Sequence, residues 1–369
     1  LKFMSKKNEI AVEVKGLSKS YGPVQAVKSI DLQIGMGEYF ALLGPSGGGK
    51  TTLLRLIGGF IRPTEGQVFL HNQEVSHLPP NARPTSMVFQ SFALFPHMTV
   101  VQNVGYGLRL KKVASAEIKD KVANMLKTVG LDGYGERMPH ELSGGQQQRV
   151  QLARSFVLET DILLLDEPLA ALDANLRRDM CIELKRLQEK IGMTFIHVTH
   201  NQEEAMTVAD NMAIIADGIL VEMGKSSDLY ENPIRRFTAD FIGENNIFDG
   251  QVSKIEDDVI HVDLGSSSIA VLSRGQKTSV GDKVSVSVRS ELARAIDTST
   301  SSTEPLEILS GVHRESVYLG LTTSELITLD NGQEVLARRV SDRYGGHTIS
   351  NGTSIKVGWR QQDGRLHIS

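Results

Sequence analysis

A glycine-rich string of eight residues constrains this chain more than any other part of its sequence. It runs from Gly44 to Thr51 (GPSGGGKT) and fits the pattern G-x-x-x-x-G-K-[ST]. An apolar run, residues 39–43, precedes it, and residues 51–57 read as a helix. Glycines let successive backbone N–H groups turn toward a phosphate at the start of such a helix. The string therefore predicts a phosphate-binding loop (P-loop) between a strand and a helix, within an α/β fold.

The fixed positions of this loop predict separate roles in binding ATP. Lys50 is expected to reach the β- and γ-phosphates, and the Thr51 hydroxyl is expected to ligate Mg²⁺. An ordinary glycine-rich turn is the alternative, which the flanking strand and helix disfavour. The other loop residues predicted to contact ATP are Gly44, Pro45, Ser46, Gly47, Gly48, Gly49 and Thr52.

A second acidic string follows a buried-type strand. Residues 162–165 are all apolar and lead into Asp166 and Glu167, a pattern typical of a central parallel strand covered on both faces. Asp166 is expected to hold Mg²⁺ through water. Glu167 is expected to polarise the attacking water as the catalytic base. An exposed acidic strand end is the alternative interpretation.

A third string, residues 142–149 (LSGGQQQR), precedes a predicted helix that runs to about residue 157. Its hydroxyl and bare N–H groups would form a second anion site at a helix start. By capping chemistry alone, a serine N-cap with glycines in a turn is the better interpretation. Since one phosphate site suffices to bind ATP, a second site in the same chain needs an explanation.

These strings, in this order, resemble the motifs of the ABC-transporter ATPases over residues 10–240. In that resemblance Tyr21 matches the aromatic residue that stacks on adenine, and Gln90 matches the catalytic, Mg²⁺-binding glutamine of the Q-loop. Asp173 matches the D-loop, and His200 matches the catalytic switch histidine. Asn201 stands where the family usually has aspartate, and it is expected to cap the following helix. The residues that match the signature motif are Ser143, Gly144, Gly145 and Gln146.

The resemblance implies how the two phosphate sites are used. Residues 1–240 would form a P-loop NTPase domain with a RecA-like core and a helical subdomain. Two copies of the chain would pair head to tail, so that the signature motif of one copy completes the ATP site of the other. The first predicted partner is therefore a second copy of the chain itself.

The sequence changes in character beyond residue 240, and residues 241–369 are predicted to form a second, all-β domain. Residues 283–288 (KVSVSV) alternate strictly, which predicts a half-buried strand. Residues 325–337 predict two strands around the turn Asp330-Asn331-Gly332. Residues 288–291 (VRSE) and 317–320 (VYLG) resemble pieces of the OB/TOBE-like regulatory domain of bacterial importer ATPases.

The segment after Gln90, residues 91–100 (SFALFPHMTV), is apolar although it falls in a loop region. Such a stretch is either a partner site or part of the core, and the resemblance favours docking on the membrane subunits. The predicted partners are thus two transmembrane permease subunits and, indirectly, a solute-binding protein. The predicted location is the cytoplasmic face of the bacterial inner membrane, where the chain would be peripheral.

The junction of the two domains bears on the transported solute. Residues 241–248 (FIGENNIF) are more similar to the junction of spermidine/putrescine and opine importers than to that of sugar importers. A polyamine is therefore the first prediction. Importers of opines, sugars, phosphonates or iron remain alternatives.

The net charge and the set of motifs disfavour other classes of ATP-binding protein. Lys plus Arg number 40 and Asp plus Glu 44, giving a net charge of −4, and we predict no nucleic-acid partner. A soluble ABC protein acting on ribosomes or DNA would usually carry a second cassette or a long coiled coil. A small-molecule kinase would not need the signature string.

His197 and His200 lie three residues apart in or at the end of a predicted strand, so they face opposite sides and no zinc site is predicted.

Overall fold

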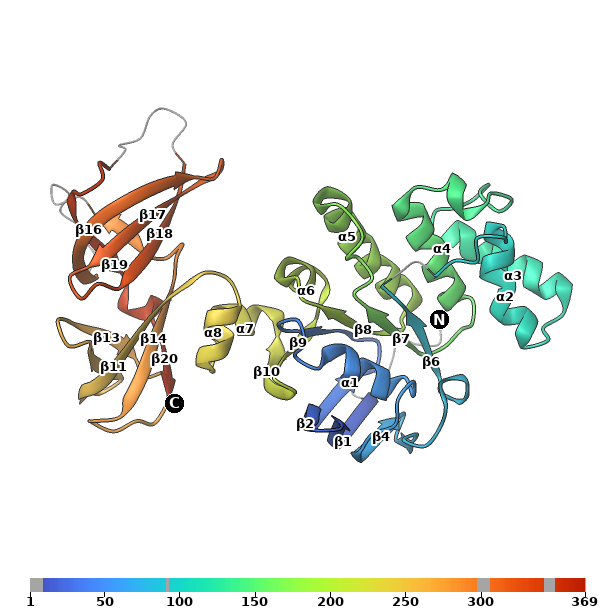
Figure 1. The fold of residues 1–369 in the computed structure, drawn as a ribbon, viewed down its shortest axis with the longest axis horizontal. Coiled ribbons are helices and arrows are strands. Elements are labelled where there is room, and N and C mark those ends of the chain that lie inside the picture. The colour runs from blue at the N-terminus through green and yellow to red at the C-terminus, as the bar shows by residue number, and fades with distance from the viewer. Residues whose placement is uncertain (1–8, 91–92, 297–305, 342–348, 369) are drawn as a thin grey trace. The chain divides into compact units, whose positions relative to one another are not determined.

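The computed structural model describes residues 9–90, 93–296, 306–341 and 349–368 (Figure 1). Contacts within the chain divide it into two compact units, of which the first ends at Ser227 and the second begins at Asp228. The change in sequence character predicts a later domain boundary, after residue 240. The helices α7 (Ser226–Glu231) and α8 (Arg236–Phe241) occupy the stretch between the two positions.

A six-stranded sheet with the order β10-β9-β3-β8-β7-β6 forms the centre of the first unit. Its strands pair in parallel except for β9 with β10, which are antiparallel. The predicted strands over residues 39–43, 162–166 and 194–199 are confirmed, and every residue in them is buried. The strands are β3 (Tyr39–Leu43), β6 (Thr85–Val88), β7 (Ile162–Asp166), β8 (Thr194–Thr199), β9 (Asn211–Ala216) and β10 (Ile219–Lys225).

Two hydrophobic cores lie on opposite faces of this sheet. Leu163 and Leu165 of β7 belong to the core that includes residues of α2–α5, whereas Ile162 and Leu164 belong to the core built with α1, β1 and β2. Because alternate residues of a strand point to opposite faces, α1 (Lys50–Ile57) and α4 (Gly144–Phe156) cover opposite faces of the sheet (Figure 1).

The remaining elements of the first unit surround these two cores. The chain's single cysteine, Cys181, is buried within α5. No helix of the described residues is long and apolar enough to cross a bilayer. These elements are β1 (Ile10–Tyr21), β2 (Val24–Gly35), β4 (Glu65–Leu70), β5 (Gln73–Glu74), α2 (Val100–Leu110), α3 (Ser115–Thr128), α5 (Ala174–Ile191), α6 (Gln202–Val208) and two 3-10 turns, Pro80–Ala82 and Pro139–Glu141.

The strands of the second unit form two five-stranded antiparallel sheets, β13-β12-β11-β14-β20 and β15-β19-β16-β17-β18. Both contribute to one core, in which the rings of Phe248 and Trp359 stack at 5.1 Å. The predicted all-β character is confirmed. The strands are β11 (Asn245–Glu256), β12 (Val259–Asp263), β13 (Ser268–Leu272), β14 (Lys283–Arg289), β15 (Arg294–Ile296), β16 (Glu307–Tyr318), β17 (Thr322–Leu329), β18 (Glu334–Val340), β19 (Ser354–Trp359) and β20 (Arg365–Ile368), with a 3-10 turn at Gln361–Asp363.

Strand β14 corrects one prediction and the β17–β18 hairpin confirms another. The alternation of residues 283–288 predicted a half-buried strand, but every residue of β14 after Lys283 is buried. The strand lies between β11 and β20, and its serines are covered by polar partners: Ser285 bonds Asp249 and Ser287 contacts His367. The hairpin forms around the predicted turn, with β17 paired antiparallel to β18.

Candidate active site

The P-loop joins β3 to α1, and its backbone passes close to neighbouring chain segments. A Cβ atom at Gly44 would lie 1.9 Å from the carbonyl oxygen of Ile215, and one at Gly49 would lie 2.4 Å from that of Ala26. Gly49 also has a φ of 103° and sits at the N-cap of α1. Only glycine fits such positions without displacing backbone. The glycines are therefore needed to place the loop against β9 and β2 at the start of the helix.

The ammonium group of Lys50 lies inside this loop. It donates hydrogen bonds to the carbonyl oxygens of Gly44 and Pro45, each at 2.8 Å. Burial lowers the pKa of Lys50, while the negative charges of Glu167 and Asp166 act in the opposite direction. The loop, its cation and both carboxylates predicted from the sequence thus share one electrostatic environment.

Oxygen atoms suited to Mg²⁺ meet at the start of α1. The Thr51 hydroxyl donates to Asp166 Oδ1 at 2.8 Å, so the two side chains present adjacent oxygen atoms. Carboxylate and hydroxyl oxygens are the hard ligands that Mg²⁺ prefers, and the pair fits such an ion. Arg55 on α1 lies 3.6 Å from Asp166 Oδ2, a contact that the sequence analysis missed.

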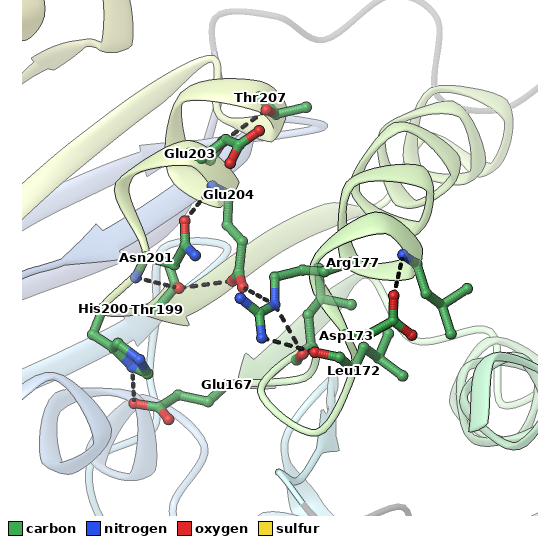
Figure 2. A network of polar contacts seen from close by, with 12 residues as sticks. Glu167, Leu172, Asp173, Arg177, Thr199, His200, Asn201, Glu203, Glu204 and Thr207 are labelled. Carbon is green, nitrogen blue, oxygen red and sulfur yellow. Dashed lines mark hydrogen bonds and ion pairs between the residues drawn. The ribbon is translucent and has the colours of Figure 1, made fainter. Parts of the chain in front are cut away.

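The carboxylate of Glu167 contacts two other predicted catalytic residues. His200 Nδ1 lies 3.2 Å from Glu167 Oε1, and Gln90 Nε2 donates to Glu167 Oε2 at 3.4 Å. Figure 2 shows the His200 and Glu167 side chains pointing toward each other from two different loops. Glu167 has a φ of 46°, and its N–H bonds to the carbonyl oxygen of Val198 on β8. This left-handed conformation is uncommon for a non-glycine residue, and the hydrogen bond to β8 holds the backbone of Glu167 in it.

Tyr21 and Asp173 lie at the ends of elements. Tyr21 closes β1, is half exposed, and has the Lys19 ammonium 5.2 Å from its ring centroid. Asp173 is the N-cap of α5, since its carboxylate accepts a hydrogen bond from the N–H of Leu176.

The signature string forms the start of α4 as a capping box. Ser143 Oγ accepts from the N–H of Gln146, and the Gln146 side chain accepts from the N–H of Ser143. Among the described residues, Lys50 bonds to Gly44 and Pro45 and not to this string, whose helix α4 packs in the core on the other face of the sheet from α1. Within one chain, the two predicted anion sites therefore belong to helices on different faces of the sheet.

The apolar segment after Gln90 is partly packed. Its first two residues, Ser91 and Phe92, lie outside the described residues. Leu94 packs against a hydrophobic core that includes Val100, and Phe95 packs on Tyr106, with ring centroids 4.7 Å apart. Pro96 and His97 are exposed. Core packing and an exposed surface thus both occur within this segment.

Comparisons with known proteins bear directly on this arrangement. The profile of the ABC transporter family matches residues 27–170. The chain is also 42% identical over 357 residues to the spermidine/putrescine import ATP-binding protein PotA of Thermobifida fusca (strain YX), covering 95% of this chain and 92% of that protein. The chain belongs to the ABC transporter family.

Further relatives of this ABC ATPase agree with that assignment. The PotA protein of Thermotoga maritima is 39% identical over 333 residues, covering 90% of each chain. Among solved structures, CbiO1 from Clostridium perfringens, part of an ABC transporter complex, has a TM-score of 0.57 and 29% identity, covering 60% of this chain and 91% of its own. A dimeric ATP-binding cassette in a post-hydrolysis state with ADP and phosphate has a TM-score of 0.52 and 33% identity, covering 58% of this chain and 98% of its own.

The predicted ABC ATPase fold is thus confirmed, and ATP binding follows from the family. Three charged residues near the site were missed by the sequence analysis: Arg55, Arg177 and Glu204. Arg177 and Glu204 line a small cavity of about 50 Å³ together with Glu167 and His200.

Proposed function

We propose that this ABC ATPase is the ATP-hydrolysing subunit of a bacterial polyamine importer. The observation that carries the proposal is the 42% identity to a spermidine/putrescine import protein across 95% of this chain. The match extends over both units, whereas the family profile covers only residues 27–170. A relationship limited to the ATPase motifs would not favour one solute, because those motifs act on ATP alone.

The site geometry supports a division of roles in hydrolysis. The loop residues 44–49 and Lys50 would hold the ATP phosphates, and Tyr21 would stack on the adenine. Thr51, Asp166 and Gln90 would hold Mg²⁺, which when bound neutralises charge on the phosphates. Glu167 would accept a proton from the attacking water or orient it. His200, 3.2 Å from Glu167, would hold that carboxylate in place or donate to a phosphate oxygen.

The separation of the two anion sites supports a head-to-tail dimer. Ser143 at the start of α4 and Lys50 at the start of α1 belong to opposite faces of the sheet. A second copy would bring its own Ser143–Gln146 string to the ATP held by Lys50, and one solved relative is a dimeric cassette.

Mixing two variants tests the dimer. Chains carrying Ser143→Ala and chains carrying Lys50→Ala are mixed, and nucleotide occupancy is measured per heterodimer. In the head-to-tail arrangement, one ATP site carries both lesions and the other carries none. Two equally impaired sites would contradict it.

The proposed assembly also includes two transmembrane permease subunits at the cytoplasmic face of the bacterial inner membrane. Pro96 and His97, exposed after the Q-loop, lie in the segment expected to contact them. A solute-binding protein would deliver the polyamine to those subunits. Both parts of this proposal follow from kinship with the import proteins.

Uptake measurements test the solute. The gene is deleted in its host, and uptake of labelled spermidine and putrescine is compared before and after complementation with the wild-type chain or the Lys50→Ala variant. Polyamine uptake is expected to be restored by the wild type only, because transport needs the phosphate-binding lysine. Unchanged polyamine uptake after deletion, together with lost uptake of an opine or a sugar, would reassign the solute.

A further inference from the structure

The two loops that carry Glu167 and His200 are joined by a second set of contacts (Figure 2). The residues on both sides of His200 take part. The Thr199 hydroxyl donates to Glu204 Oε2 at 2.7 Å and accepts from the N–H of Asn201 at 2.9 Å. Asn201 caps α6, as predicted, because its side-chain oxygen accepts from the N–H of Glu204 at 3.0 Å. The backbone around His200 is thereby fixed to Glu204.

Arg177, on the first turn of α5, holds the other loop. Its Nη2 donates to the carbonyl oxygen of Leu172 at 2.8 Å, and its Nε donates to that of Leu169 at 3.4 Å. Leu169 and Leu172 lie in the segment that leads from Glu167 to the D-loop residue Asp173. The same Nε lies 3.4 Å from Glu204 Oε1. One guanidinium group therefore links the Glu167 loop to the carboxylate that anchors the His200 loop.

Glu204 carries its charge in a nearly closed environment. It is 5% exposed, and the fully buried His197 lies 3.6 Å from its carboxylate through Nε2. The Tyr39 hydroxyl contacts the other ring nitrogen of His197 at 3.0 Å. Burial acts to raise the pKa of Glu204, but the nearby His197 ring, the hydrogen bond from Thr199 and the charge of Arg177 outweigh it, so the pKa lies below its usual value. Glu204 is therefore ionised at neutral pH and paired with Arg177.

A largely buried ion pair such as Arg177–Glu204 contributes little to the free energy of unfolding. Desolvation of two charges offsets most of their attraction, and apolar residues of similar size are often as stabilising. What the pair supplies here is geometry, because it joins two loops whose side chains must meet at one point. The cavity lined by Glu167 and His200 is also lined by Arg177 and Glu204, so the pair borders the reacting region.

We propose that Arg177 and Glu204 are positioning residues for ATP hydrolysis, which fix the 3.2 Å contact between His200 and Glu167 by joining their two loops. The proposal rests on the proposed role of Glu167 and His200 in hydrolysis. Neither residue of the pair needs to touch ATP. Loss of the pair lets the two loops move independently, and displacements near 1 Å can lower rates by up to about a hundredfold.

Steady-state ATPase kinetics of the full-length chain test this role. Glu204→Gln and Arg177→Gln are each expected to lower kcat at least about tenfold, with KM for ATP changed less than about twofold. Each substitution is then repeated in a His200→Ala background. No further loss of kcat is expected there, because the pair acts through His200. A multiplicative loss in that background would overturn the proposal, and so would full kcat in both single variants.

A matched control separates positioning from general stability. Glu183, also on α5, pairs with Arg149 at 2.6 Å and joins two helices rather than the two loops. Glu183→Gln is expected to leave kcat unchanged, and an equal loss of kcat in it would overturn the proposal. If a glutamine variant does not fold, Arg177→Lys serves instead: it keeps the charge but loses the fork that reaches Leu172, so kcat should still fall. Failure of the proposed roles of Glu167 and His200 is distinct, since the His200→Ala variant alone would then keep the wild-type kcat.

Discussion

Two adjacent carboxylates at the end of β7 have different surroundings, which fits two different roles. Asp166 is buried, accepts from Thr51 and lies near Arg55. Glu167, turned by its positive φ, instead meets His200 and Gln90. The two carboxylates thus have different partners: Asp166 lies beside the predicted Mg²⁺ ligand Thr51, and Glu167 lies beside the predicted catalytic residues His200 and Gln90.

This difference predicts the effect of Glu167→Gln. The amide keeps the size of the side chain but cannot accept a proton from water, so hydrolysis is expected to fall at least about a hundredfold while ATP binding persists. Turnover and nucleotide binding are measured on the same preparation. Glu203→Gln on α6, an exposed glutamate, is the control and should hydrolyse normally. Near-normal turnover in Glu167→Gln would remove its catalytic assignment.

Sequence patterns reveal residues of this site only where chemistry fixes the spacing. The loop from Gly44 to Thr51 could be predicted because one short segment must supply glycines, a cation and a hydroxyl in order. Arg177 and Glu204 could not, since each lies on a helix where a charged residue usually faces solvent. The two residues lie more than twenty residues apart in the sequence and meet only in the folded chain.

At the scale of elements, the P-loop shows how neighbouring strands constrain a turn. Gly49 faces the carbonyl oxygen of Ala26 on β2, whereas a Cβ atom at Gly47 would meet no atom within 4 Å. Both glycines have positive φ values, 103° and 79°. Both positions therefore have a backbone conformation that residues other than glycine rarely adopt, but only Gly47 has room for a Cβ atom.

That contrast predicts unequal costs for two alanine substitutions. Gly47→Ala should lower the free energy of unfolding by about 1–2 kcal/mol, the cost of placing a Cβ in the left-handed region. Gly49→Ala should cost at least about 2 kcal/mol more, because β2 must also move away. Denaturant unfolding of both variants measures the difference. Equal costs would show that the loop relaxes without moving β2.

Strand β14 illustrates what periodicity leaves out at this scale. Strict alternation correctly predicts that residues 283–288 form a strand. It predicts exposure of the serine face because small polar residues are usually solvated. In the structure Ser285 and Ser287 bond to Asp249 and His367 instead, and those partners come from strands distant in sequence.

At the scale of the whole molecule, the chain has separate cores in its two units. The cores of the first unit contain no residue beyond 220, and the core of the second begins at Phe248. In α8, however, Thr238 and Ala239 are fully buried, and the helix belongs to the second unit. The change in sequence pattern after residue 240 marks where the β-strands of the second unit begin. The division by contacts comes earlier, between Ser227 and Asp228.

Truncated chains distinguish the two possible domain boundaries. Chains ending at Ser227 and at Asp240 should both bind ATP with Mg²⁺, because every predicted ATP residue precedes them. The chain ending at Asp240 should aggregate more readily, since it exposes Thr238 and Ala239 without the second unit. Nucleotide titration and light scattering measure the two effects. A folded truncated chain with no nucleotide binding would show that the second unit contributes to the site.

The chain's single cysteine is buried, which makes site-specific labelling of the chain practical. Cys181 is 2% exposed, and burial raises its pKa to about 12, so almost no reactive thiolate exists at neutral pH. Maleimide dyes or spin labels should therefore react selectively with cysteines introduced at exposed positions, without removal of the native one. Distances between labelled copies could then report, in real time, on whether ATP draws two chains together.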